Sequence, residues 1–193
     1  MKNIPQVFII VATSLDGYIA QVREQSSVSW ASKEDNQFFH QKTKEAGVIV
    51  MGSTTFKTIN SKYLPLAERL NVVYSSSSSK ELINELSIDQ EKVNEKNLMT
   101  TTQSPSQLVN ELGALGYEQI AICGGSSIYT QFLQSGLVNK IYVTVEPIIF
   151  GDGIKLFNQS VAKKMRLSSS KKLNDGGTLL LEYELIKESP NDS

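Results

Sequence analysis

Short runs of apolar, often β-branched residues recur along this chain, and helix-like patterns separate them. The runs cover residues 7–12, 48–51, 70–74, 120–123 and 141–145. A continuous apolar run of about four to eight residues is typical of a strand that is buried on both faces. Helices on both sides of a mostly parallel sheet bury strands in this way. The alternation therefore predicts a single-domain, three-layer α/β fold.

Helix signals lie between these runs. Residues 32–35 have the spacing of a capping box and open a predicted helix that runs to about Glu45. Ser104 and Pro105 place a cap and a first-turn proline ahead of a helix that runs to about Leu115. A further helix starts near Gly125, and its core face is marked by Ile128, Phe132 and Leu133. The weakest signals are in residues 75–79 and 88–96, and we interpret the first of these as a loop.

The pattern changes after about residue 135. Residues 141–145, 165–173 and 178–186 have the character of strands with no helix between them. The sequence Asp175-Gly176-Gly177 supplies a hairpin turn for the last pair. We therefore expect the sheet to end in antiparallel C-terminal strands, the domain to span residues 1–187, and residues 188–193 to be a flexible tail.

The composition is that of an ordinary globular domain of 193 residues. Lys and Arg (19) nearly balance Asp and Glu (20), which argues against a nucleic-acid partner and against a polybasic membrane surface. A single cysteine, Cys123, and a single histidine, His40, argue against a disulfide and against a metal site. The sequence shows neither a signal peptide nor the roughly 20 apolar residues of a membrane span, so we expect a cytoplasmic protein.

Two predicted strands run into glycine and then into small hydroxyl residues that open a helix. The two turns are Gly52 with Ser53, Thr54 and Thr55, and Gly124-Gly125 with Ser126 and Ser127. Glycine lets the backbone approach a ligand closely, and a helix N-terminus offers free N–H groups. Two such turns at the carboxyl ends of parallel strands suit a ligand with a pyrophosphate. They are equally consistent with two tight turns capped by Ser and Thr, and neither matches the GxGxxG or Walker pattern.

Asp35 is the unusual residue of the first predicted helix. Phe38 and Phe39 follow it at helical spacing, so its carboxylate lies on or beside the apolar stripe. A partly buried carboxylate has a raised pKa and can deliver a proton near neutral pH. Two alternatives stay open: Asp35 completes the helix cap with Ser32, or Glu34 is the active carboxylate.

Three other polar features carry less information. His40 has no partner acid or thiol nearby in the sequence, and we interpret it as a surface or core-edge residue. Cys123 lies inside a predicted strand and is interpreted as inert packing. Ser75 and Ser76, which follow the strand at 70–74, either belong to a flexible loop or contact a ribose or 2′-phosphate.

Taken in order, these segments resemble the dihydrofolate-reductase-like superfamily over residues 6–157. The resemblance lies in residues 12–20, the Trp30 and Asp35 pair, and the blocks 48–56, 65–76 and 120–133. Each block alone is weak, but five in the same order are specific. Residues 14–20 and 146–157 are most similar to the riboflavin-biosynthesis pyrimidine reductases, which form the RibD C-terminal domain of a bifunctional deaminase-reductase.

The resemblance implies an NADPH-dependent reductase and assigns roles by position. Asp35 and Tyr129 fall at catalytic positions. Trp30, Phe39 and Arg69 fall at substrate positions, with Arg69 on the arginine that holds the folate glutamate carboxylate. The implied cofactor-binding residues are Ala12, Ile19, Gly52, Ser53, Thr54, Thr55, Ser75, Ser76, Cys123, Gly124, Gly125, Ser126, Ser127 and Ile128.

The expected reaction is hydride transfer to a pyrimidine- or pteridine-type small molecule, as in 5-amino-6-(5-phosphoribosylamino)uracil reductase. Alternatives are dihydrofolate reductase, which Trp30, Asp35 and Arg69 favour, a reductase of another small carbonyl or imine, and a non-catalytic dinucleotide-binding protein. Two departures concern the ligands. Ser53 stands where dihydrofolate reductases often carry a basic residue, and residues 58–63 lack the arginine-containing segment of the riboflavin-type enzymes. The resemblance also implies a homodimer, and we expect a stand-alone reductase without a zinc-binding deaminase domain ahead of it.

Overall fold

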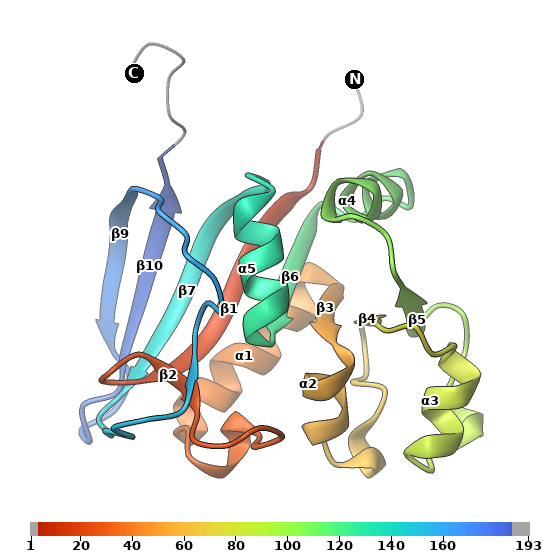
Figure 1. The fold of residues 1–193 in the computed structure, drawn as a ribbon, viewed down its shortest axis with the longest axis horizontal. Coiled ribbons are helices and arrows are strands. Elements are labelled where there is room, and N and C mark those ends of the chain that lie inside the picture. The colour runs from red at the N-terminus through yellow and green to blue at the C-terminus, as the bar shows by residue number, and fades with distance from the viewer. Residues whose placement is uncertain (1–3, 187–193) are drawn as a thin grey trace.

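The computed structural model describes residues 4–186, and eight of its strands form one sheet (Figure 1). In spatial order these strands are β5 (Leu98–Thr101), β4 (Leu70–Tyr74), β3 (Val48–Gly52), β6 (Gln119–Gly124), β1 (Gln6–Ser14), β7 (Val138–Glu146), β10 (Leu179–Leu185) and β9 (Met165–Lys172). The first six run parallel to one another, whereas β10 is antiparallel to both β7 and β9. The expected α/β fold, with a mostly parallel sheet and antiparallel C-terminal strands, is confirmed.

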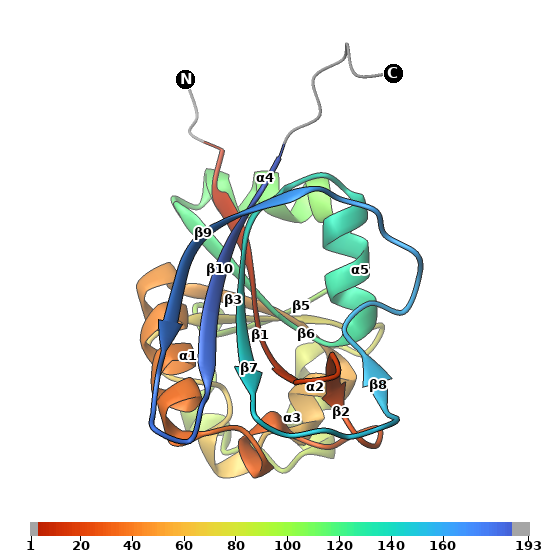
Figure 2. The same cartoon turned by 90° about the vertical axis from the view of Figure 1, so that its left-hand side faces the viewer.

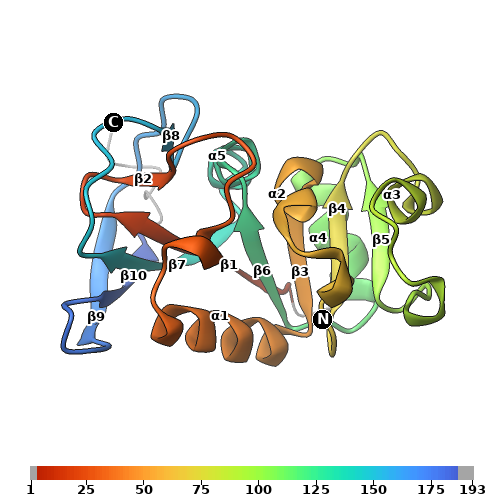
Figure 3. The same cartoon turned by 90° about the horizontal axis from the view of Figure 1, so that it is seen from below.

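Helices cover both faces of this sheet, and Figure 3 shows α1 on one face and α5 on the other. The helices are α1 (Lys33–Ala46), α2 (Ser53–Thr58), α3 (Ser79–Glu85), α4 (Pro105–Ala114) and α5 (Ser126–Gln134). Side chains of α4 and α5 belong to one apolar core, and side chains of α1, α2 and α3 belong to the other. The sheet therefore lies between two helical layers.

Strand β1 shows why the central strands consist of continuous apolar runs. Val7, Ile9 and Val11 contribute to the core under α4 and α5. Phe8 and Ile10, which alternate with them, contribute to the core on the side of α1. Because both faces are covered, each of these positions is removed from water, and burying such a side chain contributes about 1.5–3 kcal/mol.

The two C-terminal strands form a hairpin at one end of the sheet, where Figure 2 shows them side by side. Their ends lie within one residue of the expected ranges 165–173 and 178–186. The turn is closed by a 2.8 Å hydrogen bond from Leu173 N to Thr178 O, and Gly177 lies in it at a φ of 100°. All residues of β9, which lies at the edge of the sheet, are exposed.

Several regular elements were not expected from the sequence. Helix α3 begins within the serine run that we interpreted as a loop, and β5 has only two apolar residues, Leu98 and Met99. The helix has a signal that could have been used: Ser78 and Glu81 form a full capping box. A small second sheet pairs β2 (Tyr18–Ala20) with β8 (Ile154–Lys155).

The expected tail at residues 188–193 lies outside the described residues. Over residues 4–186, none of the helices combines the length and apolar character that crossing a membrane requires.

Candidate active site

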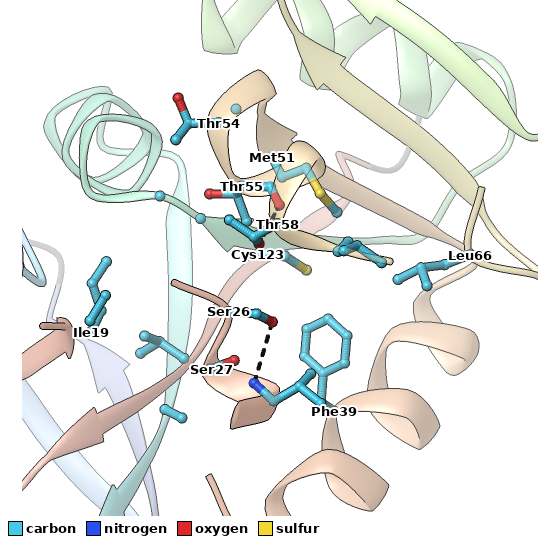
Figure 4. A pocket seen from close by; sticks show the side chains of 18 of the residues that line it. Ile19, Ser26, Ser27, Phe39, Met51, Thr54, Thr55, Thr58, Leu66 and Cys123 are labelled. Atoms are coloured by element: carbon cyan, nitrogen blue, oxygen red, sulfur yellow. Dashed lines mark hydrogen bonds between the residues drawn. The ribbon is translucent and has the colours of Figure 1, made fainter. Parts of the chain in front are cut away.

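A cavity of about 1790 Å³ opens at the carboxyl ends of the parallel strands. Its wall includes the last residues of β3 and β6, the second half of β1, and parts of α1, α2 and α5 (Figure 4). The structure brings most of the expected site residues into this one wall. They are Ala12, Ile19, Asp35, Phe39, Gly52, Ser53, Thr54, Thr55, Arg69, Cys123, Gly124, Gly125, Ser126, Ser127, Ile128 and Tyr129.

The two glycine turns lie next to each other because β3 pairs with β6, with Met51 opposite Gly124. Gly124 has a φ of 118°, and a Cβ there would lie 3.2 Å from the Tyr129 hydroxyl. A Cβ at Gly125 would lie 3.1 Å from Thr55 Oγ1. Neither glycine can therefore be replaced without strain or displacement of a neighbour.

Gly52 has a different reason to be glycine. Its φ is −80°, which any residue can adopt, but a Cβ there would lie 3.3 Å from Ile128 Cγ1. Glycine at this point lets helix α5 pack closely against the end of β3.

The start of α5 is equipped to hold an anion. Gly125 is its N-cap and contributes no side-chain cap, so the first backbone N–H groups are available to a ligand. The Ser126 hydroxyl is buried in the cavity wall and has no hydrogen-bond partner among the described residues. A buried polar group without a partner is costly, and a ligand oxygen would satisfy it.

Asp35 lies in the first turn of α1 and is only 7% exposed. Burial raises the pKa of Asp35 to about 6, and the nearby negative charge of Glu146 adds to the rise. A hydrogen bond from the Thr144 side chain offsets part of it. A carboxyl group of this pKa is partly protonated near neutral pH and can act as an acid.

The structure shows how Asp35 and Glu34, the residues of the two open alternatives, lie relative to the helix cap and the cavity. The Ser32 hydroxyl accepts the backbone N–H of Asp35 at 3.2 Å, so Asp35 takes part in the cap through its backbone. The backbone N–H of Ser32 goes instead to Glu146 Oε1 at 2.8 Å, which leaves the carboxylate of Asp35 out of the cap. Glu34 accepts a hydrogen bond from Asn174 at 2.9 Å and is absent from the cavity wall. That hydrogen bond lowers the pKa of Glu34, so it is not the raised carboxyl group.

Tyr129 is 3% exposed, and its hydroxyl donates a hydrogen bond of 3.0 Å to the Ile10 carbonyl. Burial raises the pKa of Tyr129 well above its ordinary value. The phenol of Tyr129 therefore stays protonated near neutral pH. The catalytic role expected for Tyr129 stays a prediction.

Arg69 is 5% exposed and lines the cavity. Its side chain donates to the Ala67 carbonyl at 2.9 Å and to the Thr43 hydroxyl. No carboxylate within the described part of the chain forms an ion pair with it. A buried guanidinium without an acidic partner is suited to bind an anionic ligand group.

The cavity wall is more basic than the chain as a whole, which the sequence did not reveal. Its charged residues are the cations Arg23, Lys33, Lys44, Lys62, Arg69 and Lys92 and the acids Glu24 and Asp35. The cations come from segments that are far apart in the sequence, so no local cluster could have indicated them. His40 also lines the cavity, and partial burial together with the charges of Arg69 and Lys44 lowers its pKa.

Three expected residues lie outside this wall. Trp30 packs edge-on against Phe150, with ring centroids 5.2 Å apart. Ser75 accepts a hydrogen bond from Ser77 N at 3.0 Å, and Ser76 is exposed. Instead of the two serines, Tyr74 at the end of β4 reaches the cavity, and its buried hydroxyl has no partner among the described residues. The binding roles of these three residues stay predictions.

Comparisons with known proteins agree with this fold. The RibD C-terminal domain family matches residues 5–179. The bifunctional dihydrofolate reductase-thymidylate synthase of Plasmodium vinckei is 32% identical over 101 residues, which span 52% of this chain and 50% of that protein. The chain thus matches only about half the length of this relative.

Two solved structures share the architecture. The pyrimidine reductase-like protein of Corynebacterium diphtheriae has a TM-score of 0.73 at 22% identity, over 96% of this chain and 94% of that one. The diaminohydroxyphosphoribosylaminopyrimidine deaminase/5-amino-6-(5-phosphoribosylamino)uracil reductase of Thermotoga maritima has a TM-score of 0.72 at 16% identity, over 96% of this chain and 58% of that one. At these identities the likeness shows the fold alone.

Proposed function

The chain belongs to the RibD C-terminal domain family, and from that premise we propose that it is an NADPH-dependent reductase of a pyrimidine- or pteridine-type heterocycle. The reaction proposed first is that of a 5-amino-6-(5-phosphoribosylamino)uracil reductase, the activity in the name of the Thermotoga maritima protein. The observation that supports the proposal most is that the acid and the glycine turns line the same cavity. Its wall holds a buried acid, Asp35, and the paired glycine turns at Gly52 and Gly124–Gly125.

The residues at the glycine turns fit a dinucleotide cofactor. Helix α5 begins without a side-chain cap, and the Ser126 hydroxyl beside it has no partner among residues 4–186. Gly124 and Gly125 leave room that a Cβ would fill. We assign the pyrophosphate to the N-terminus of α5 and a phosphate or ribose contact to Thr54 and Ser53. When bound, a nicotinamide dinucleotide supplies a hydride.

Asp35 would hold the heterocycle and provide the proton that its reduction requires. The protonated carboxyl group donates a hydrogen bond to a ring nitrogen or carbonyl oxygen, and its pKa of about 6 keeps a useful fraction protonated near neutral pH.

Arg69 would bind the anionic end of the substrate. Its buried guanidinium has no acidic partner among the described residues, and Lys44 and Lys62 lie in the same wall. A substrate phosphate and a substrate carboxylate both suit this arrangement. The charge of the cavity therefore supports an anionic substrate and does not choose between the two groups.

Dihydrofolate reductase is the second candidate, and it has its own support. The Plasmodium vinckei relative carries that activity in its name, and the match to it covers half of this chain. Of the three residues that favoured this candidate, Asp35 and Arg69 line the cavity and Trp30 does not.

The decisive experiment follows the loss of NADPH absorbance with purified protein. Dihydrofolate and 5-amino-6-(5-phosphoribosylamino)uracil are offered in parallel reactions, and NADH replaces NADPH in a second pair. We expect turnover of the phosphoribosylamino-uracil. Turnover of dihydrofolate alone would assign the second candidate. Tight NADPH binding without turnover of either compound would contradict both candidates. It would leave a reductase of another small carbonyl or imine and a non-catalytic dinucleotide-binding protein as the alternatives.

We also propose that the protein is a homodimer, as the family resemblance implies. The sheet edge supports this, because β9 is exposed on both faces and Leu167 and Leu179 are 49% and 41% exposed. We expect light scattering to give twice the chain mass of 21.4 kDa. Leu167→Lys should shift the protein toward the monomer, whereas Leu115→Lys, at an exposed site just after α4, should not. A monomer mass for the wild type at all concentrations would refute the dimer.

A further inference from the structure

Glu146, the last residue of β7, is a buried carboxylate with no role in the reaction described so far. It is 4% exposed, and both of its oxygens accept hydrogen bonds. Oε1 accepts the backbone N–H of Ser32 at 2.8 Å, and Oε2 accepts the Thr178 hydroxyl at 2.6 Å. The side chain thus joins the start of α1 to the turn that precedes β10.

The bond to Ser32 replaces one that the helix would otherwise make by itself. In a capping box, the side chain three residues after the cap accepts the backbone N–H of the cap residue. Two helices of this chain do this: Glu81 accepts from Ser78 N at 2.6 Å, and Gln107 accepts from Ser104 N at 3.1 Å.

Helix α1 has the same spacing, and only half of the box is present. The Ser32 hydroxyl accepts the N–H of Asp35, but the N–H of Ser32 is already taken by Glu146. The Asp35 carboxylate therefore has no partner in the cap, and it lies in the cavity wall.

We propose that Glu146 is a positioning residue for Asp35: by accepting the Ser32 N–H, it keeps the acid out of the helix cap and in the cavity. This inference rests on the proposed role of Asp35 in the reaction. The turn before β10 holds Glu146 in place, because Thr178 donates to it and itself accepts a 3.0 Å hydrogen bond from Asn174.

Glu146 has an electrostatic effect in the same direction. The titratable groups that face Asp35 are Glu146 on β7 and the Tyr129 hydroxyl on α5, while Glu34 on α1 is bound to Asn174. A negative charge beside Asp35 opposes its ionisation, so Glu146 helps keep the acid protonated.

Two variants separate position from charge. In Glu146→Gln, the amide oxygen can still accept the Ser32 N–H, but the charge is gone. In Glu146→Ala, both are lost, and the freed Ser32 N–H becomes available to the Asp35 carboxylate. The control is Glu184→Gln, on the exposed ion pair with Arg166.

The first readout is the pKa of Asp35, measured by carbon NMR of the labelled carboxyl group and assigned with Asp35→Asn. This titration needs no substrate, so it tests the inference even if the proposed reaction fails. We expect the pKa of Asp35 to fall in Glu146→Gln and to fall further in Glu146→Ala, and to stay unchanged in Glu184→Gln.

The second readout is the pH profile of substrate reduction. We expect the fall in rate with rising pH to begin at lower pH in Glu146→Gln. Near neutral pH, Glu146→Ala should lose at least about tenfold in kcat, with NADPH affinity unchanged. A loss of stability in both variants with the pKa of Asp35 unchanged would overturn the proposal. If Glu146→Ala fails to fold, the titration of Glu146→Gln decides.

Discussion

The Tyr129 hydroxyl donates a 3.0 Å hydrogen bond to the Ile10 carbonyl, a residue 119 positions earlier in the chain. This bond ties the first turn of α5 to the middle of β1, beside the Gly124 turn. A residue expected to be catalytic therefore has a clear structural task as well.

Tyr129→Phe separates these two roles. Removing the hydroxyl leaves the buried Ile10 carbonyl without its partner, so we expect the free energy of unfolding to fall by about 1–3 kcal/mol. We expect turnover to fall by less than about tenfold, because the high pKa of Tyr129 disfavours loss of its proton. Urea unfolding and steady-state kinetics measure the two effects. The control is Tyr117→Phe, because Tyr117 lies outside the cavity wall. A loss of turnover as large as that of Asp35→Asn would show that the hydroxyl acts on the substrate.

Asp35→Asn should reduce turnover by about 10²–10⁴-fold, because the amide cannot deliver a proton. NADPH affinity should stay the same, because Asp35 serves the substrate and not the cofactor in our proposal. The neighbouring substitution Glu34→Gln is the control, because Glu34 is outside the cavity wall. Equal activity of Asp35→Asn and wild type would remove Asp35 from the mechanism.

The pKa of Asp35 also predicts how stability and rate depend on pH. Its folded value of about 6 lies above the ordinary value of 3.8, so the folded state binds the proton more tightly than the unfolded state does. The resulting stabilisation is present below about pH 4 and is lost as the pH rises through about 6, with a size of at most about 3 kcal/mol. Asp35→Asn should remove this pH dependence from the unfolding free energy.

The wild-type reduction rate should fall over the same pH range, because Asp35 loses the proton that the reduction requires. A rate that is constant between pH 5 and about 8 would contradict this.

Gly124→Ala tests the space at the proposed cofactor site. Alanine at a φ of 118° is strained, and its Cβ would meet the Tyr129 hydroxyl at 3.2 Å. Gly116→Ala is the matched control, since its φ is 93° and nothing lies within 4 Å of the added carbon. We expect both to lose about 1–2 kcal/mol of stability from backbone strain. Only Gly124→Ala should weaken NADPH binding, by at least about tenfold, as measured by fluorescence titration. Equal NADPH affinity in the two variants would place the cofactor elsewhere.

Arg69→Gln tests the proposed anion site. A hydrogen bond to a charged group is worth about 1.5–3 kcal/mol, so KM for the anionic substrate should rise by about 10–150-fold with a smaller change in kcat. Arg166→Gln, which removes an exposed cation on β9, should leave KM unchanged. If Arg69→Gln alters kcat and NADPH affinity but not KM, the guanidinium holds the fold or the cofactor and not the substrate.

The central part of the fold was predictable from residues that are close in the sequence. The strands of residues 7–12 and 120–123 were visible because both faces of the sheet are covered, which makes every position apolar. Strand β5 was missed because it is short and only two of its residues are apolar. Helix α3 was missed because its capping serine, Ser78, lies in a run of serines that we interpreted as a loop.

The candidate site was predictable in its parts and not in its arrangement. The glycine turns and Asp35 were identified from local patterns, and they line one cavity. The basic wall was not foreseen, because Lys44, Lys62 and Lys92 come from separate segments. Trp30, Ser75 and Ser76 were expected in the site by resemblance, and the structure places them outside the cavity wall.

Local patterns in the sequence predict the α/β alternation, the two glycine turns and a carboxylate beside the apolar stripe of α1. These features depend on neighbouring residues, through side-chain periodicity, backbone freedom and helix capping. Contacts between distant segments, by contrast, place the Asp35 carboxylate in the cavity wall and raise its pKa. Burial is the main cause of the raised pKa, and Glu146, which accepts the Ser32 N–H from 114 residues away, adds a negative charge beside Asp35. Charge and desolvation act through space. The pKa of a buried group therefore depends on residues that are far apart in the sequence, which local sequence patterns do not identify.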